Sequence, residues 1–115
     1  MNVTAIPEDQ IEFDKVIVFN TAHITESDNK LLNDMAQGLY PEAELIVDGH
    51  DYGFRIYVPL DYTDDDFNAV VNTARKEGMS DEFSILLHIA RTYKANWMKL
   101  DCDGSTYKQI PTFEW

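Results

Sequence analysis

Apolar and polar residues along this chain follow two periods, one typical of strands and one typical of helices. Val16–Phe19 is a β-branched and aromatic run that is apolar on both sides, which is typical of a central strand. Thr25–Asp28 has the form of a capping box, and apolar residues follow it at helical spacing as far as Gly38. We therefore predict a first strand at Val16–Phe19 and a first helix at Glu26–Gln37.

A hairpin and two further helices are predicted next. Glu44–Val47 and Tyr52–Val58 are strand-like runs around Asp48-Gly49, a common hairpin turn. In that register one face carries Leu45, Val47, Tyr52, Phe54 and Ile56. Thr63 and Asp66 form a second capping box before an apolar stripe that ends at Gly78. Ser80 is predicted to cap a third helix.

The last two predicted strands are Trp97–Leu100 and Tyr107–Trp115, joined by a turn at Asp101–Gly104. Lys99 and Pro111 both suit a sheet edge. The resulting order, βαββααββ, contains the split βαβ pattern. We predict an α+β fold with a mostly antiparallel, ferredoxin-like sheet in strand order 4-1-3-2 and helices packed on one face, which places Val16–Phe19 in the interior.

Length and composition favour one globular domain over residues 1–115, with residues 1–12 loosely attached because they lack periodicity. The apolar fraction of 44% and the aromatic share of 12% argue against disorder. The single cysteine, Cys102, cannot form an internal disulfide, and no secretory leader pattern is present, so we expect a reducing cytoplasm. No apolar run reaches the roughly 20 residues that span a bilayer.

Charge narrows the class of partner. The chain has 21 acidic and 9 basic residues, a net charge of -12. This charge argues against direct nucleic-acid binding, which relies on Lys and Arg against phosphates, and it favours basic protein surfaces as partners. Solubility or a salt-rich habitat is the alternative reason for such acidity. The predicted partner-binding residues are Asp48, Asp51, Asp61, Asp64 and Asp65.

Motifs for catalysis or metal binding are incomplete. Asp64–Asp66 is best explained as helix capping, since consecutive helical side chains diverge by about 100° and cannot converge on one ion. The turn at Asp101 fails the calcium-loop pattern, because Thr106 and Thr112 stand where that pattern needs Gly and Glu. We therefore predict no cofactor, no tightly bound zinc or calcium and no catalytic residue.

Histidine chemistry remains an alternative. His23 and the hairpin residues His50 and Asp48 are expected at one end of the sheet, which would allow a small enzyme or metal protein centred on His23 and His50. Asp101 is expected at the opposite end. Cys102 has no neighbouring base in the sequence and is not predicted to be a nucleophile.

Three segments carry a resemblance to a known family: Asn20–Thr25, Trp97–Gly104 and Ile110–Trp115, which ends in Pro-Thr-Phe-Glu-Trp. They resemble an uncharacterised family of small proteins carried by bacterial phages and plasmids. The resemblance implies a mobile-element setting, in which accessory proteins block host defence or redirect nucleic-acid enzymes, and it assigns no site residues. The leading hypothesis is a protein that binds, and inhibits, such an enzyme by presenting carboxylates to its basic groove. A phage structural or assembly component is a further alternative.

Overall fold

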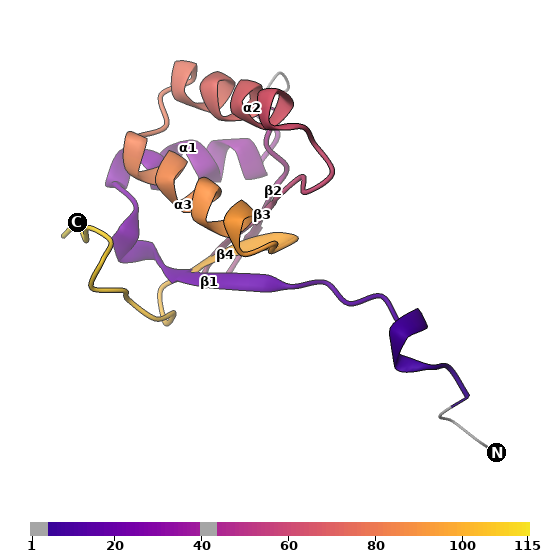
Figure 1. Cartoon of the computed structure of the whole chain (residues 1–115). Coiled ribbons are helices and arrows are strands. Elements are labelled where there is room, and N and C mark those ends of the chain that lie inside the picture. Colours follow the sequence, from indigo (N-terminus) through magenta and orange to yellow (C-terminus); the bar gives the residue numbers. More distant parts are fainter. Residues whose placement is uncertain (1–4, 40–43) are drawn as a thin grey trace.

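The computed structural model describes residues 5–39 and 44–115, which form a four-stranded sheet with helices on one side of it (Figure 1). The helices are α1 (Glu26–Ala36), α2 (Asp64–Lys76) and α3 (Asp81–Thr92), with short 3-10 turns η1 (Glu8–Gln10) and η2 (Thr21–His23). The strands are β1 (Val16–Asn20), β2 (Val47–His50), β3 (Gly53–Tyr57) and β4 (Trp97–Asp101). The predicted α+β class and mostly antiparallel sheet are confirmed.

The sheet order is β1-β4-β3-β2, so the predicted order 4-1-3-2 is wrong. β1 lies at an edge, parallel to β4, and β4 is antiparallel to β3. The side chains of β4 explain its interior place. Met98 and Leu100 are fully buried under the helices, and on the open face Trp97 packs edge-on against Tyr57. Lys99, predicted at an edge, lies in this interior strand.

The helix caps are confirmed. The Thr25 hydroxyl accepts from the Asp28 N–H while the Asp28 carboxylate accepts from the Thr25 N–H, which completes the predicted capping box. The hydroxyls of Thr63 and Ser80 accept from the N–H groups of Asp66 and Phe83 and so cap α2 and α3, but within the described residues the Asp66 carboxylate does not return the bond, so the predicted second capping box is only half formed. These caps depend on residues three positions apart, so the sequence alone predicts where each helix begins.

The β2–β3 hairpin turns later than predicted. His50 pairs with Gly53, so Asp51 and Tyr52 form the turn, and the predicted turn at Asp48-Gly49 is wrong. Gly53 has a φ of 151°, and a Cβ there would lie 1.9 Å from the Leu100 carbonyl oxygen. The glycine that the fold requires is therefore Gly53, because β4 lies directly against its backbone.

The C-terminal segment Tyr107–Trp115 does not form the predicted last strand. It is held against η2 and the residue after it by hydrogen bonds. The Phe113 N–H donates to the Ala22 carbonyl at 2.7 Å, and the Trp115 indole N–H donates to the Ile24 carbonyl at 3.0 Å. Pro111 has no N–H to offer a sheet partner, which is consistent with this irregular path.

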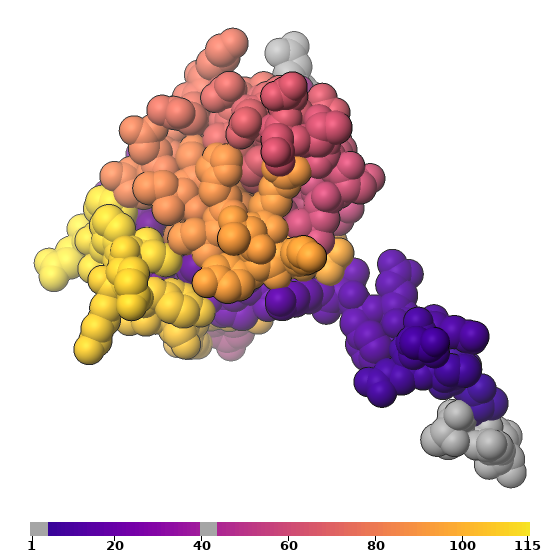
Figure 2. All heavy atoms as spheres, in the orientation of Figure 1, coloured from indigo at the N-terminus to yellow at the C-terminus, as the bar shows by residue number. Residues whose placement is uncertain are grey.

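Residues 5–14, which we call the arm, extend away from the body of the protein (Figures 1 and 2). Every arm residue is exposed, including the apolar side chains of Ile6, Ile11 and Phe13. Residues 1–12 were predicted to be loosely attached. Residues 5–12 belong to the arm, and residues 1–4 lie outside the described part of the chain. None of the helices described in residues 5–39 and 44–115 is long and apolar enough to cross a membrane.

A buried carboxylate joins two helices. Asp28, on the first turn of α1, is fully buried and accepts hydrogen bonds from the Ser80 N–H at 2.8 Å and the Ser80 hydroxyl at 2.5 Å. With the bond from Thr25, both oxygens have partners. We call Thr25, Asp28 and Ser80 the junction. Because Ser80 also caps α3, the junction fixes the start of α1 against the start of α3.

Candidate functional site

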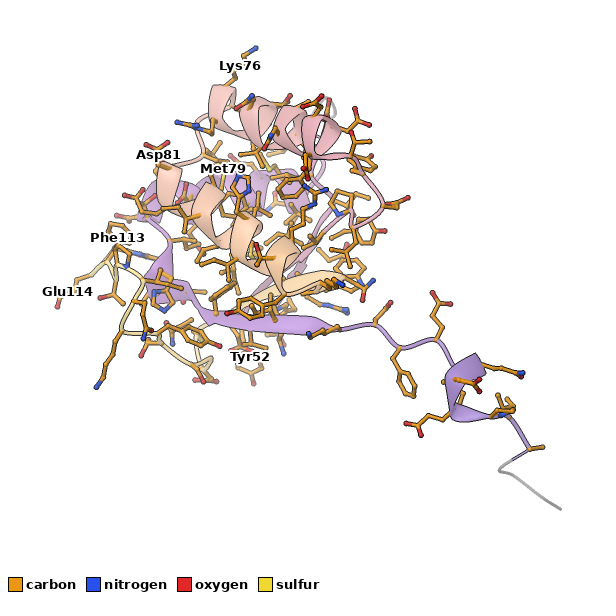
Figure 3. All side chains as sticks on the ribbon, viewed as in Figure 1. Tyr52, Lys76, Met79, Asp81, Phe113 and Glu114 are labelled. Carbon is orange, nitrogen blue, oxygen red and sulfur yellow. The ribbon has the colours of Figure 1, made fainter. Side chains whose placement is uncertain are left out.

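The predicted partner-binding carboxylates fall into two separate groups. Asp48 and Asp51 lie on the hairpin before β3, whereas Asp61, Asp64 and Asp65 follow β3. The five residues of β3 separate Asp51 from Asp61 by roughly 17 Å of strand, whereas Asp48 lies on β2 opposite Arg55, on the sheet face away from the helices. Figure 3 labels Tyr52 of the hairpin turn on the side of the molecule away from α2. The two groups therefore cannot be treated as one contact surface.

The carboxylates that follow β3 lie close together in the chain, and Glu44, which precedes β2, joins them in the fold. Glu44 and Asp66 line the same open hollow of about 590 Å³ together with Tyr62. Asp61 precedes that tyrosine in the chain. We call Glu44, Asp61, Asp64, Asp65 and Asp66 the acidic patch, and all five residues are exposed.

Arg91 of α3 anchors the acidic patch to the body. Its guanidinium donates to the Asp64 carboxylate at 2.9 Å and to the Tyr62 carbonyl at 2.7 Å, and it lies 4.7 Å from the centre of the Phe67 ring. These contacts fix the loop before α2 against α3. One arginine neutralises only one of the patch's carboxylates, so the patch keeps a surplus of negative charge.

The hairpin end is chemically different. Asp48 pairs across the sheet with Arg55, so a cation lies opposite it. Asp51 lines an open hollow of about 600 Å³ whose polar lining includes Asn29, Asn33, His50 and Cys102. Within the described residues, His50 Nε2 is buried and has no hydrogen-bond partner, while Nδ1 accepts from the Tyr52 N–H at 3.2 Å.

His23 is a structural residue. It is fully buried, and its Nε2 accepts from the Tyr107 N–H at 2.9 Å, so Nδ1 carries the proton and donates to the Pro111 carbonyl at 2.9 Å. Both ring nitrogens are occupied by backbone groups of the C-terminal segment. His23 therefore has no nitrogen free to bind a metal or to transfer a proton.

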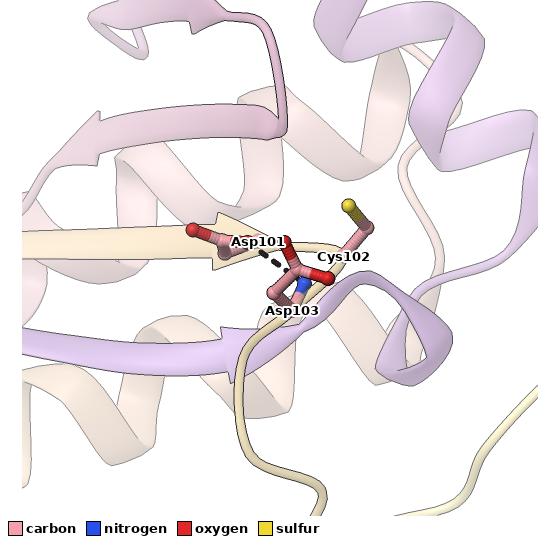
Figure 4. A group of neighbouring side chains, drawn as sticks. All are labelled: Asp101, Cys102 and Asp103. Carbon is pink, nitrogen blue, oxygen red and sulfur yellow. Dashed lines mark hydrogen bonds between the residues drawn. The ribbon is translucent and has the colours of Figure 1, made fainter.

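The turn at the end of β4 gathers three potential metal ligands. Donor atoms of Asp101, Cys102 and Asp103 lie within 4.8 Å of one another (Figure 4). Asp101 is already engaged, since it accepts from the Asp103 N–H at 2.8 Å and pairs with Lys99 at 3.3 Å. These contacts hold the pKa of Asp101 below its usual value, the Asp103 hydrogen bond being the largest cause.

Asp101 lies at the same end of the sheet as the end of β1, because it pairs with Asn20. Its predicted place at the opposite end is wrong for the same reason as the strand order, since β1 and β4 are parallel. Sequence reasoning also missed Tyr62, Glu44 and Arg91 as parts of one surface. Arg91 lies 27 positions from Asp64, and no local spacing rule connects the two.

The family comparison covers nearly the whole described chain. Residues 16–115 match the model of the C-terminal domain of a family of unknown function, DUF5983. This agrees with the resemblance of the sequence to an uncharacterised family. Searches of curated proteins and of solved structures each gave no match.

Proposed function

Because the chain belongs to DUF5983, a family of unknown function, and carries the acidic patch at the start of α2, we propose that it acts by binding a protein with a basic surface. Asp61, Asp64 and Asp65, with Glu44 and Asp66, form the contact. Asp48 and Asp51 lie outside this contact, because Asp51 is in the hairpin turn and Asp48 lies opposite Arg55, on the sheet face away from the helices.

The observation that supports the acidic patch is a surplus of carboxylates beyond what the helix needs. Acids in the first turn stabilise a helix by about 0.3–1 kcal/mol each, which accounts for Asp64, Asp65 and Asp66. Glu44 and Asp61 lie outside α2 and gain nothing from its first turn. They raise the repulsion within the patch, and a cationic partner would relieve it.

The hollow between Glu44 and Asp66 suggests how a partner is engaged. A lysine or arginine side chain can enter it and meet Glu44, Asp66 and Tyr62, all of which line it. Carboxylates pair with such a cation, and an aromatic face attracts it further. Arg91 holds the backbone of Tyr62 in place, so the hollow exists before the partner arrives.

The specific mechanism we propose is inhibition of a nucleic-acid-handling or defence enzyme in the cytoplasm of a bacterial host. Such an enzyme has a basic groove for phosphates, and the closely spaced carboxylates of the acidic patch can compete for its Lys and Arg. The resemblance to proteins of phages and plasmids supports this setting, and the net charge of -12 supports the electrostatic mode.

The test is affinity capture from a bacterial lysate with three baits of matched design. The first bait is the unaltered protein. The second carries Asp61→Lys and Asp65→Lys in the acidic patch, and the third carries Asp48→Lys and Asp51→Lys on the hairpin. Each Asp→Lys substitution raises the net charge by two, so the two substitutions in either variant change it from -12 to -8. Quantitative mass spectrometry compares the captured proteins.

We expect a basic protein that is captured by the unaltered and hairpin baits and lost with the patch bait. Added duplex nucleic acid should displace it if the partner uses its phosphate groove. Equal capture by all three baits would contradict the acidic patch as the contact. If both variants lose the protein equally, its capture depends on net charge and not on the acidic patch.

A further inference from the structure

An apolar groove opens beside the edge strand β1. Its volume is about 590 Å³, and its walls come from β1, α3 and the C-terminal segment. Most of its lining is apolar or aromatic: Ile17, Phe19, Ile89, Tyr93, Tyr107 and Ile110. Ile17 and Phe19 belong to the inner face of β1, so the groove is where the core reaches the surface.

Lysines adjoin the groove residues, although the chain as a whole is acidic. The Lys15 ammonium donates to the Tyr93 carbonyl at 2.8 Å, on the α3 wall. Lys94 follows Tyr93 in the chain, and Lys108 follows Tyr107. Among the residues that the structure describes, no acidic residue lines the groove. Three of the nine lysines and arginines, which we call the rim lysines, therefore bond to a groove residue or follow one in the chain.

The arm has the opposite character. It carries four acids, Glu8, Asp9, Glu12 and Asp14, and no base. It also exposes Phe13 at 71% and Ile11 at 42%. Ile11 and Phe13 are two positions apart, so in an extended chain they lie on one face and can enter one groove together.

From this complementarity we propose that the arm occupies the β1 groove of a second copy of the chain, and that the exchange is reciprocal. Ile11 and Phe13 fill the apolar groove, and the arm's carboxylates meet the rim lysines. The contact uses the same surfaces on both copies, as a two-fold dimer requires. This inference does not depend on the acidic patch.

The arm's own groove is a poor fit because of how Lys15 is fixed. Its N–H donates to the Asn96 side chain at 2.8 Å, and its carbonyl accepts from the Asn96 and Trp97 N–H groups. An arm folding back along β1 would have to reverse between Phe13 and Lys15. That stretch has no glycine or proline, and the arm instead leaves the body (Figure 1).

Sedimentation velocity over a range of concentrations tests the exchange. We expect a reversible dimer for the unaltered chain and a dissociation constant at least about tenfold higher for Phe13→Asp, because burial of an aromatic side chain is lost. Leu39→Asp is the control, since Leu39 is exposed at 62% beyond the end of α1 and lies outside the groove. Its dimer should be unchanged.

A photo-crosslinking amino acid at position 13 locates the contact. Mixed ¹⁵N-labelled and unlabelled chains should give crosslinked peptides of mixed label that join the arm to the segments around Tyr93 or Ile110. A chain that stays monomeric at high concentration would overturn the proposal, as would a dimer unaffected by Phe13→Asp. Crosslinks found only within single chains would place the arm in its own groove and overturn it too.

Discussion

The junction and the acidic patch use the same carboxylate group in opposite circumstances. Asp28 is fully buried and its oxygens accept three hydrogen bonds, from Thr25 and from the backbone and hydroxyl of Ser80. Asp61 and Asp65 of the acidic patch are exposed. A buried charge is tolerated only when it is hydrogen-bonded, whereas an exposed one costs little.

The difference separates acids that hold the fold from acids that are free to act. Removal of Asp28 would leave the partly buried donors of Ser80 and Thr25 without their acceptor. Removal of Asp65 affects only the first turn of α2 and the field outside it. The net charge of -12 is therefore a sum over residues with different roles.

The largest effect is expected at the junction. Asp28→Ala should lower the free energy of unfolding by about 2–4 kcal/mol, since partly buried donors lose their acceptor. Asp65→Ala should change it by less than about 1 kcal/mol. Urea unfolding followed by circular dichroism measures both. Equal effects of the two substitutions would remove the distinction between junction and patch.

A second test compares a buried histidine, His23, with an exposed one, His88. His23→Ala removes two hydrogen bonds to the C-terminal segment and leaves a cavity, so we expect a loss of about 2–3 kcal/mol. His88→Ala is the control, because His88 is exposed. Amide hydrogen exchange at Tyr107 and Phe113 should rise in the His23 variant. Unchanged protection there would show that His23 does not hold the segment.

The sequence predicts local features of this fold well and long-range features poorly. The caps at Thr25, Thr63 and Ser80 follow from neighbouring residues, and all three are confirmed. The strand order was wrong because the apolar run of β1 resembles a central strand, while the choice between β1 and β4 depends on which helices cover them.

The junction is another long-range contact that the sequence does not predict. Asp28 and Ser80 are each predicted as capping residues, yet the bond between them links positions 52 residues apart. The acidic patch was predicted in part, because Asp61, Asp64 and Asp65 are neighbours in the chain. Glu44 and Arg91 join it only through the fold.

A smaller effect is expected at Arg91, where body and patch meet. Arg91→Ala removes hydrogen bonds to Asp64 and Tyr62 and should lower stability by about 1 kcal/mol. It also makes the patch more negative, so association with a basic partner should not slow. Thermal unfolding and stopped-flow binding measure the two effects. Slower association would mean that the shape of the loop matters more than its charge.

The smallest effect is expected from added metal. Lys99 and the Asp103 N–H engage the Asp101 carboxylate, so zinc and calcium would have to displace them. We expect calorimetry of metal-free protein to show no stoichiometric site with a dissociation constant below about 1 µM. A site lost on Cys102→Ser would instead assign a metal role to this turn.

The central claim is that the acidic patch, and not total charge, binds a basic partner. The most direct measurement is the association rate constant with the captured partner as ionic strength rises, for the unaltered protein and the two matched charge reversals. Surface charges are screened beyond about 10 Å at 0.1 M salt. We predict fast, salt-sensitive association for the unaltered protein and for Asp48→Lys with Asp51→Lys, and slow, salt-insensitive association for Asp61→Lys with Asp65→Lys. Identical rates and salt dependence for the two double variants would contradict the claim.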